Sequence, residues 1–369
     1  PPALLGADDP GAGRDAETGP AAPAGQDDRR EPGALRRNAG PVLVACGAFF
    51  ATFALLLRLY VYGQLAVLPG DVEAELQLVD EAASYLDTGT WKTVEEAEVT
   101  RTTDIYGEPN PGDPGRSVWQ MSVDTAAPNT MIAHMDRRVI VDRSTGRAVN
   151  CCGEHVDGDR AVRQAGLVLH WPANARGAEY PLYDADIRAA PRMVLDGEED
   201  VAGVATRKYV QEIEATQIPD SAREVPAAAL GLERRGTVTA TRWLEVRRSY
   251  WIEPVSGHLV NAVEKRHETL RSESRAGERV LLDAEFAMPD HLVAAHAEEA
   301  ESRSLLLTAL RTWLPAGLGA LGAALILVGL VRTWVGERRA RDAEAPAAVE
   351  DAEAPVDAGD ADPEGTAGR

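Results

Sequence analysis

The chain has 369 residues, of which 44% are hydrophobic, so it is long enough to bury a sizeable core in one large or two modest domains. Its formal charge is −21, and it has no broad basic segment that could neutralise a phosphate backbone, which excludes nucleic acid as an expected partner. The cysteines Cys46, Cys151 and Cys152 are too few for a disulfide framework and wrongly spaced for the usual four-ligand zinc site.

Both ends of the chain are predicted to be disordered. Residues 1–38 and 340–369 are rich in Ala, Gly, Pro and charged residues, and they cannot bury enough apolar surface to offset the entropy of ordering. The second tail also carries a run of acidic residues that repel one another. We interpret both as solvated cytoplasmic tails; the alternative for the acidic tail is a binding segment for a basic partner.

Two long apolar stretches, residues 41–62 and 312–334, are predicted to be transmembrane helices. At about 1.5 Å of rise per residue, the first covers about 33 Å, enough to cross a hydrocarbon core of about 30 Å. The second contains twenty consecutive residues without a charge, from Thr312 to Val331. The competing interpretation of the first stretch is a cleavable signal peptide, but its apolar run exceeds the roughly 7 to 15 residues of such a segment.

The charges that flank these segments predict their orientation. Arginines precede the first segment and follow the second, so the positive-inside rule places both termini in the cytoplasm of a two-pass plasma-membrane protein. These arginines are Arg29, Arg30, Arg36, Arg37, Arg332, Arg338, Arg339 and Arg341. Residues 63–311 are then an extracytoplasmic domain, with Tyr62 and Trp313 at the outer membrane interface.

The extracytoplasmic domain has the pattern of an antiparallel β-sheet. Segments that mix β-branched and aromatic residues with alternating polar residues are 94–103, 118–123, 138–141, 204–214, 237–246 and 249–252. Turns are predicted at Glu108–Gly115 and at Asp196-Gly197. The predicted fold class is an α+β membrane protein in which two transmembrane helices bracket a β-rich, mainly antiparallel domain.

A ten-residue segment of this domain occurs twice with related sequence. Val141–Asn150 reads VDRSTGRAVN, and Ile252–Asn261 reads IEPVSGHLVN. Each copy predicts a strand, a turn whose acidic residue accepts hydrogen bonds from turn amides, a glycine with positive φ, and a second strand. Two related halves are one explanation, and convergence of unrelated hairpins is the other.

The end of the domain is predicted to be helical. Between Pro289 and Arg311, apolar residues recur at steps of three or four on one stripe, with charged residues off it. We expect this helix to run towards the second transmembrane segment and to end at Pro315, because proline lacks an amide hydrogen.

Small residues predict close packing of the transmembrane helices. The segment Gly317–Gly322 formally matches a dinucleotide-binding pattern, but that pattern must follow a strand, and this one lies inside an apolar stretch. We interpret Gly319 and Ala323 as a small-residue face, with Gly47 and Ala51 as the matching face on the first segment. The contact would form within the chain or, in a homo-oligomer, between chains.

The segment Asn150–His155, with sequence NCCGEH, is the most distinctive short motif of the domain. A bond between Cys151 and Cys152 would be strained, because adjacent Cα atoms are only about 3.8 Å apart in a trans peptide, but an extracytoplasmic location favours oxidation. We predict a structural vicinal disulfide or an intermolecular bridge rather than a redox or metal site. Cys46 is expected to be a buried apolar residue.

The sequence contains no recognisable catalytic, metal or cofactor motif. The histidines have no HExxH or other ligand spacing, and the chain lacks a nucleophile elbow, a phosphate-binding Walker loop and an EF-hand spacing. The numerous carboxylates predict a solvated face. We therefore expect no catalytic residue, no metal and no cofactor, and a protein that is not an enzyme.

Several motifs together resemble a known family. Two apolar segments around a domain of this size, the strings Asp142–Gly146 and Asn150–Glu154, and later Gly203–Tyr209 and Trp251–Gly257, are similar to the actinobacterial PorA-type porin family. The likeness covers roughly residues 38–334. It implies a cell-envelope protein from a family whose members are mostly of unknown function, and it contributes no catalytic residue.

The sequence thus predicts a non-enzymatic plasma-membrane protein that presents a β-rich binding or scaffolding domain to the cell envelope. Its expected partners are the lipid bilayer and an envelope lipid, glycan or protein. The alternative is a porin-like or transport protein of the envelope. Neither apolar segment has a polar stripe to line water, and an outer-membrane barrel requires strands with apolar exteriors.

Overall fold

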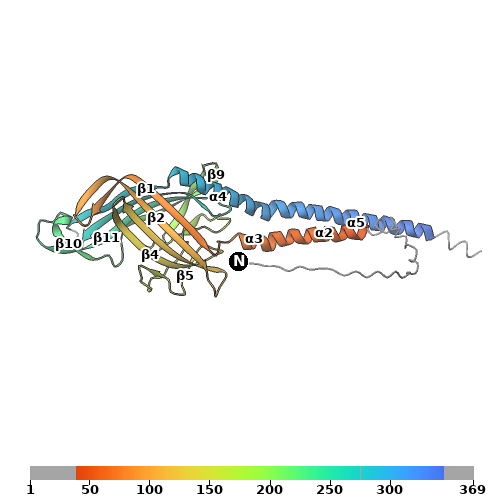
Figure 1. Cartoon of the computed structure of the whole chain (residues 1–369), viewed down its shortest axis with the longest axis horizontal. Coiled ribbons are helices and arrows are strands. Elements are labelled where there is room, and N and C mark those ends of the chain that lie inside the picture. The colour runs from red at the N-terminus through yellow and green to blue at the C-terminus, as the bar shows by residue number, and fades with distance from the viewer. Residues whose placement is uncertain (1–38, 275, 345–369) are drawn as a thin grey trace, which may run out of the picture. The chain divides into compact units, whose positions relative to one another are not determined.

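Two long helices flank a β-rich domain along the chain, as the sequence predicts. The computed structural model describes residues 39–274 and 276–344 (Figure 1). The helical elements are α2 (Ala39–Leu56), η1 (Leu57–Val61), α3 (Tyr62–Leu65), η2 (Ala227–Leu230), α4 (Asp290–Thr308), η3 (Ala309–Trp313) and α5 (Leu314–Glu344). The predicted tails 1–38 and 345–369 lie outside the described residues, whereas residues 340–344 continue α5.

Both long helices are apolar enough to cross a membrane. The candidate spans are Ala39–Leu65 and Asp290–Arg341, which contain the two predicted segments. Only 17% of each apolar window is buried, whereas the core helix of a soluble domain would be mostly buried. The described chain divides into two compact units: residues 39–45 with 326–344, and residues 46–325.

The helix predicted to start near Pro289 does not end at Pro315, contrary to the prediction. The π-helical turn η3 precedes Pro315 and joins α4 to α5 without a break. Pro315 has no amide hydrogen for the carbonyl oxygen of Arg311, four residues earlier. Nη1 of Arg58 instead approaches that oxygen to 3.5 Å, so a side chain from the first helix partly replaces the missing donor.

Among the described residues, thirteen strands form one antiparallel sheet. They are β1 (Val72–Asp87), β2 (Lys92–Pro109), β3 (Arg116–Ala127), β4 (Thr130–Asp142), β5 (Ala148–Val149), β6 (His155–Val156), β7 (Glu179–Pro181), β8 (Arg192–Val201), β9 (Val204–Gln217), β10 (Arg223–Pro226), β11 (Thr237–Ile252), β12 (Leu259–Ser272) and β13 (Glu278–Ala287). The main path is β5-β4-β3-β2-β1-β13-β12-β11-β9-β8-β7, with β10 paired to β11 and β6 to β4. The first long strand therefore pairs with the last one.

Two of the strand predictions need correction. The segments 237–246 and 249–252 belong to the single strand β11, because Arg248 at the predicted break faces inward and pairs with Glu264. Asp196-Gly197 is not a turn but an irregularity within β8, where the pairing register with β9 shifts. The reversal between these strands comes later, at Ala202 and Gly203, both with positive φ.

The core lies on one face of the sheet, which the segment between β6 and β8 covers. Trp171 of this segment is fully buried, with its ring 5.9 Å from that of Tyr250 and 6.1 Å from that of Tyr209. Leu167 and Leu182 of the same segment are also buried. On the strands that they cover, alternate residues face this segment; we call this side the inner face and the opposite side the outer face.

The two related ten-residue segments form turns with the same hydrogen bonds. The amide of Asp142 donates to the carbonyl of Arg147, and the amide of Glu253 donates to that of His258, both at 2.9 Å. Gly146 and Gly257 have φ of +68° and +78°, and a Cβ on either would lie within 2.4 Å of the carbonyl oxygen of His170 or Trp171. Both turns thus require glycine. Whether the halves arose by duplication stays a prediction.

Candidate functional site

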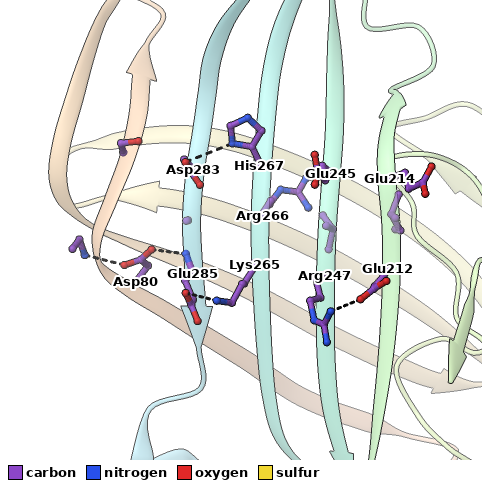
Figure 2. Close-up of a pocket in the computed structure, with 15 residues that line it drawn as sticks. Asp80, Glu212, Glu214, Glu245, Arg247, Lys265, Arg266, His267, Asp283 and Glu285 are labelled. Atoms are coloured by element: carbon purple, nitrogen blue, oxygen red, sulfur yellow. Dashed lines mark hydrogen bonds and ion pairs between the residues drawn. The ribbon is translucent and has the colours of Figure 1, made fainter. Parts of the chain in front are cut away.

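An open groove of about 630 Å³ lies on the outer face of the sheet, across β1, β9, β11, β12 and β13 (Figure 2). It forms because outward-facing positions on these neighbouring strands carry long polar side chains. The labelled charged residues that line it are Asp80, Glu212, Glu214, Glu245, Arg247, Lys265, Arg266, His267, Asp283 and Glu285. Arg266 belongs mainly to the inner face, where its charged group lies.

Ion pairs between neighbouring strands order this groove. Figure 2 shows Arg247 pointing towards Glu212 and Lys265 towards Glu285, with 2.8 Å between the charged atoms of the second pair. Nδ1 of His267 lies 3.6 Å from the carboxylate of Asp283. Such exposed pairs contribute little to stability. Their main effect is to fix the orientation of these side chains along the groove.

The groove carries a net negative charge. Six carboxylates line it, and Arg247 and Lys265 are the outward-facing cations when His267 is neutral. Among the described residues, Glu214 and Glu245 have no basic partner within ion-pair distance. A concave surface lined by charges of one sign concentrates ions of the opposite sign, so this negatively charged groove favours cations.

The inner face carries a second, buried set of charges. Four carboxylates and four arginines form a continuous ion-pair network: Asp184, Asp186, Glu264, Glu268, Arg101, Arg242, Arg248 and Arg266. The side chain of Arg266 is only 2% exposed and contacts three of the carboxylates. In Glu264, Oε2 lies 2.5 Å from Nε of Arg248, and Asp184 contacts the same arginine at 2.6 Å.

The surroundings of Glu264 and Arg266 favour their charged forms. Burial opposes the ionisation of Glu264, but the charges of Arg248 and Arg101 outweigh it and lower the pKa of Glu264 to about 2. Burial likewise disfavours the charge on Arg266, yet its carboxylate neighbours raise its pKa above the ordinary value. These charges hold the side chains of the inner face in fixed positions through their ion pairs.

The prediction that the carboxylates form a solvated face is wrong for this network. Glu264 and Glu268 lie at inward positions of β12, in step with the buried Ala262 and Leu270. The alternation along β12 assigns these positions to the core, yet they carry charged residues. Sequence reasoning missed this signal. The partner Asp186 lies 80 residues away in sequence from Arg266, so the pairing itself was not visible.

The structure brings the sulfur atoms of Cys151 and Cys152 together in the arrangement of a vicinal disulfide. Their Cα atoms are 3.7 Å apart, and Cys152 has a positive φ of 66°. Nη1 of Arg116 lies 3.8 Å from the sulfur of Cys151. The oxidised state stays a prediction. Cys46 is exposed on α2, contrary to the expectation that it would be buried.

Within the chain, the expected contact of Gly319 and Ala323 with Gly47 and Ala51 is wrong. A Cβ on Gly319 would meet no atom within 4 Å, and Ala323 is exposed. The residue that packs there is Gly322, where a Cβ would lie 2.7 Å from the carbonyl oxygen of Gly47. Gly322 lies about 60° around the helix axis from Gly319, because three residues turn a helix through about 300°, and this offset takes Gly319 out of the contact.

The comparison with known families decides where this chain belongs. The model of the Porin PorA family matches residues 39–331, from the first helix through most of the second. The chain belongs to the PorA porin family. A search of the curated proteins finds no match. The PorA family and the two apolar helices point to a membrane protein.

The family also bears on the two functional interpretations. A porin family fits the porin-like alternative better than the binding or scaffolding interpretation that the sequence first favoured. Among residues 39–274 and 276–344 of this PorA-family protein, no group of three or more His, Cys, Asp or Glu side chains is placed to hold a metal ion.

Proposed function

We propose that this PorA-family protein is a porin-like or transport protein of the cell envelope that handles small cations. Its two apolar helices would anchor it in the plasma membrane as a two-pass protein, with both termini in the cytoplasm. The family match over residues 39–331 is the observation that carries the proposal. The net negative groove on the outer face supports the preference for cations.

The pathway for solutes would involve more than one copy of the chain. The described helices have exposed apolar surfaces, including Phe49, Leu327 and Val331, and no polar stripe for water. A homo-oligomer formed through the spans would bring several sheet domains together. The small residues Gly319 and Ala323, which are exposed or uncontacted in the described part of the chain, would then pack between copies. No enzymatic step forms part of this proposal.

Conductance in a planar lipid bilayer tests the proposal. We expect the purified full chain to produce stepwise currents with a preference for potassium over chloride. Replacing the two groove carboxylates that form no ion pair with the described residues, Glu214→Gln with Glu245→Gln, should shift the reversal potential towards that of an unselective pore. Glu73→Gln, on an exposed position outside the groove, is the matched control and should leave it unchanged.

A second candidate is a binding domain for an envelope component, without conduction. The observation that favours it is the groove itself, because a concavity of about 630 Å³ is within the usual size range of ligand sites. Native mass spectrometry of the chain extracted from its membrane distinguishes the two. A co-purifying lipid, glycan or protein, together with a silent bilayer, would support binding and contradict the porin-like proposal.

A further inference from the structure

The inner face of the sheet carries one more positive charge than its buried carboxylates neutralise. Besides the four arginines of the network, Arg137 of β4 lies there. Each of the four carboxylates has a network arginine nitrogen at 2.5 to 2.7 Å. Within the part of the chain that the structure describes, Arg137 forms no ion pair, so five arginines face four carboxylates.

Arg137 is held in place by neutral groups. Its Nε donates a hydrogen bond of 2.6 Å to Oε1 of Gln164, and its guanidinium carbon lies 4.8 Å from the ring centroid of Tyr183. These contacts fix the orientation of the guanidinium but supply no full negative charge. Arg137 is 6% exposed, and burial lowers its pKa to about 10, so it remains a cation at neutral pH.

Arg137 and Tyr183 line a cavity of about 90 Å³ between the inner face and the segment that covers it. Its other walls combine apolar residues, including Leu76, Leu78 and Met121, with the ion-paired side chains of the network. These are Arg101, Arg248, Asp184, Asp186 and Glu264. Nη2 of Arg137 and the hydroxyl of Tyr183 are both buried, and neither has a hydrogen-bond partner among the described residues. Burial raises the pKa of Tyr183, so its hydroxyl keeps a hydrogen to donate.

We propose that this cavity is a binding site for a small oxyanion, a carboxylate or a phosphate, held by Arg137 and Tyr183. An oxyanion accepts hydrogen bonds from both unpartnered donors and neutralises the one surplus charge. A water molecule would fit the volume and accept the same bonds, but it carries no charge to offset the fifth arginine of the inner face. The site lies inside the domain and does not depend on whether the chain conducts.

Anion binding to the purified full chain in detergent tests this site. Sodium acetate and sodium phosphate are titrated by calorimetry against sodium chloride at equal ionic strength, and thermal unfolding is followed in parallel. We expect acetate or phosphate to bind and to raise the melting temperature more than chloride does, because they bind the folded state alone. Equal effects of all three salts would overturn the proposal.

Substitutions assign the binding to the cavity. Arg137→Met should weaken binding by about tenfold or more, and Tyr183→Phe by about threefold, since each removes one donor to the anion. Arg192→Met is the matched control, because Arg192 is exposed and pairs with Glu179 on the surface. Unchanged binding in both cavity variants would mean surface binding only and would contradict the proposal.

Arg137→Met should fold, because it removes a charge that has no buried carboxylate partner. If it does not, Tyr183→Phe alone decides the outcome by the same titration. The source of the anion is distinguished with micelles of phosphatidylglycerol or phosphatidylcholine. Stabilisation by phosphatidylglycerol that depends on Tyr183 and Arg137, and that exceeds the effect of free phosphate, identifies a lipid headgroup; stabilisation by free phosphate alone identifies a soluble anion.

Discussion

At the scale of residues, the contrast between the two faces of β12 is the clearest feature. Arg266 faces inward, is 2% exposed and contacts Asp186, Glu264 and Glu268. Lys265, its neighbour, faces outward and pairs with Glu285, with both side chains more than half exposed. A buried charge that loses its partner is far more costly than an exposed one.

Arg266→Met should therefore lower the free energy of unfolding by about 3 to 5 kcal/mol, because it leaves buried carboxylates without a counter-charge. Lys265→Met should lower it by no more than about 1 kcal/mol. Denaturant unfolding of the full chain in detergent, followed by tryptophan fluorescence, measures both. Similar losses for the two variants would contradict the assignment of Arg266 to a buried network.

A histidine pair makes the domain sensitive to acid. Burial lowers the pKa of His258 to about 4, and Nε2 of His258 lies 3.2 Å from Nδ1 of His296, with Glu299 at 3.8 Å. Because the unfolded chain binds a proton near pH 6.5 and the folded chain does not, stability is present above pH 6.5 and falls as the pH drops towards 4.

His258→Asn should reduce this loss of stability between pH 6.5 and 4 by about 1 to 3 kcal/mol. His291→Asn, at an exposed position on the same helix as His296, should not. Unfolding midpoints measured at several pH values test both. A pH dependence identical to that of the unchanged chain would show that His258 does not titrate differently on folding.

The adjacent cysteines give a third prediction at this scale. If Cys151 and Cys152 are oxidised, alkylation of the denatured, non-reduced chain should label Cys46 alone, because a disulfide does not react with the reagent. Mass spectrometry counts the labels. Three labels on freshly prepared protein would contradict the disulfide.

At the scale of elements, helix contacts depend on which side of each helix carries a glycine. Gly322 packs on Gly47 and Ala51, and a Cβ on Gly329 would lie 2.8 Å from the carbonyl oxygen of Gly40. Close contact of backbones needs small residues at these positions. Gly319 lies in open space instead.

Gly322→Leu should weaken crosslinking between cysteines introduced at Val44 and Ile326, in a chain whose native cysteines are replaced by serine. The expected loss is a few-fold, because individual contacts between spans contribute only about 1 kcal/mol. Gly319→Leu should leave the crosslink unchanged. The reverse pattern would contradict the described contact.

At the scale of the whole molecule, the first and last long strands of the sheet pair with each other, β1 with β13. The chain therefore enters and leaves the domain on neighbouring strands. Consistent with this, Tyr62 and Arg311 meet where the two helices join the domain, with the guanidinium carbon 5.6 Å from the ring centroid, and both side chains contact Asn174.

In this arrangement the chain enters and leaves the domain on the same side of a membrane. The two helices should therefore cross the membrane in opposite directions. A reporter that is active only in the cytoplasm should work when fused after Arg339, and one active only outside should work when inserted at the β2–β3 turn after Asn110. Exchanged activities would contradict the proposed topology.

The sequence by itself determined the two apolar helices, the antiparallel strands and the two related turns. These features depend on local patterns: uninterrupted apolar residues, alternation, and an acidic residue followed by glycine. Only the tertiary structure decided that Gly322 rather than Gly319 packs, that the helix continues past Pro315, and that Arg137 forms no ion pair within the described part of the chain. Each of these depends on a residue distant in sequence: Gly47, Arg58 and, for Arg137, Gln164. Contact with such a residue, rather than the residue's own type, sets the energy of the position.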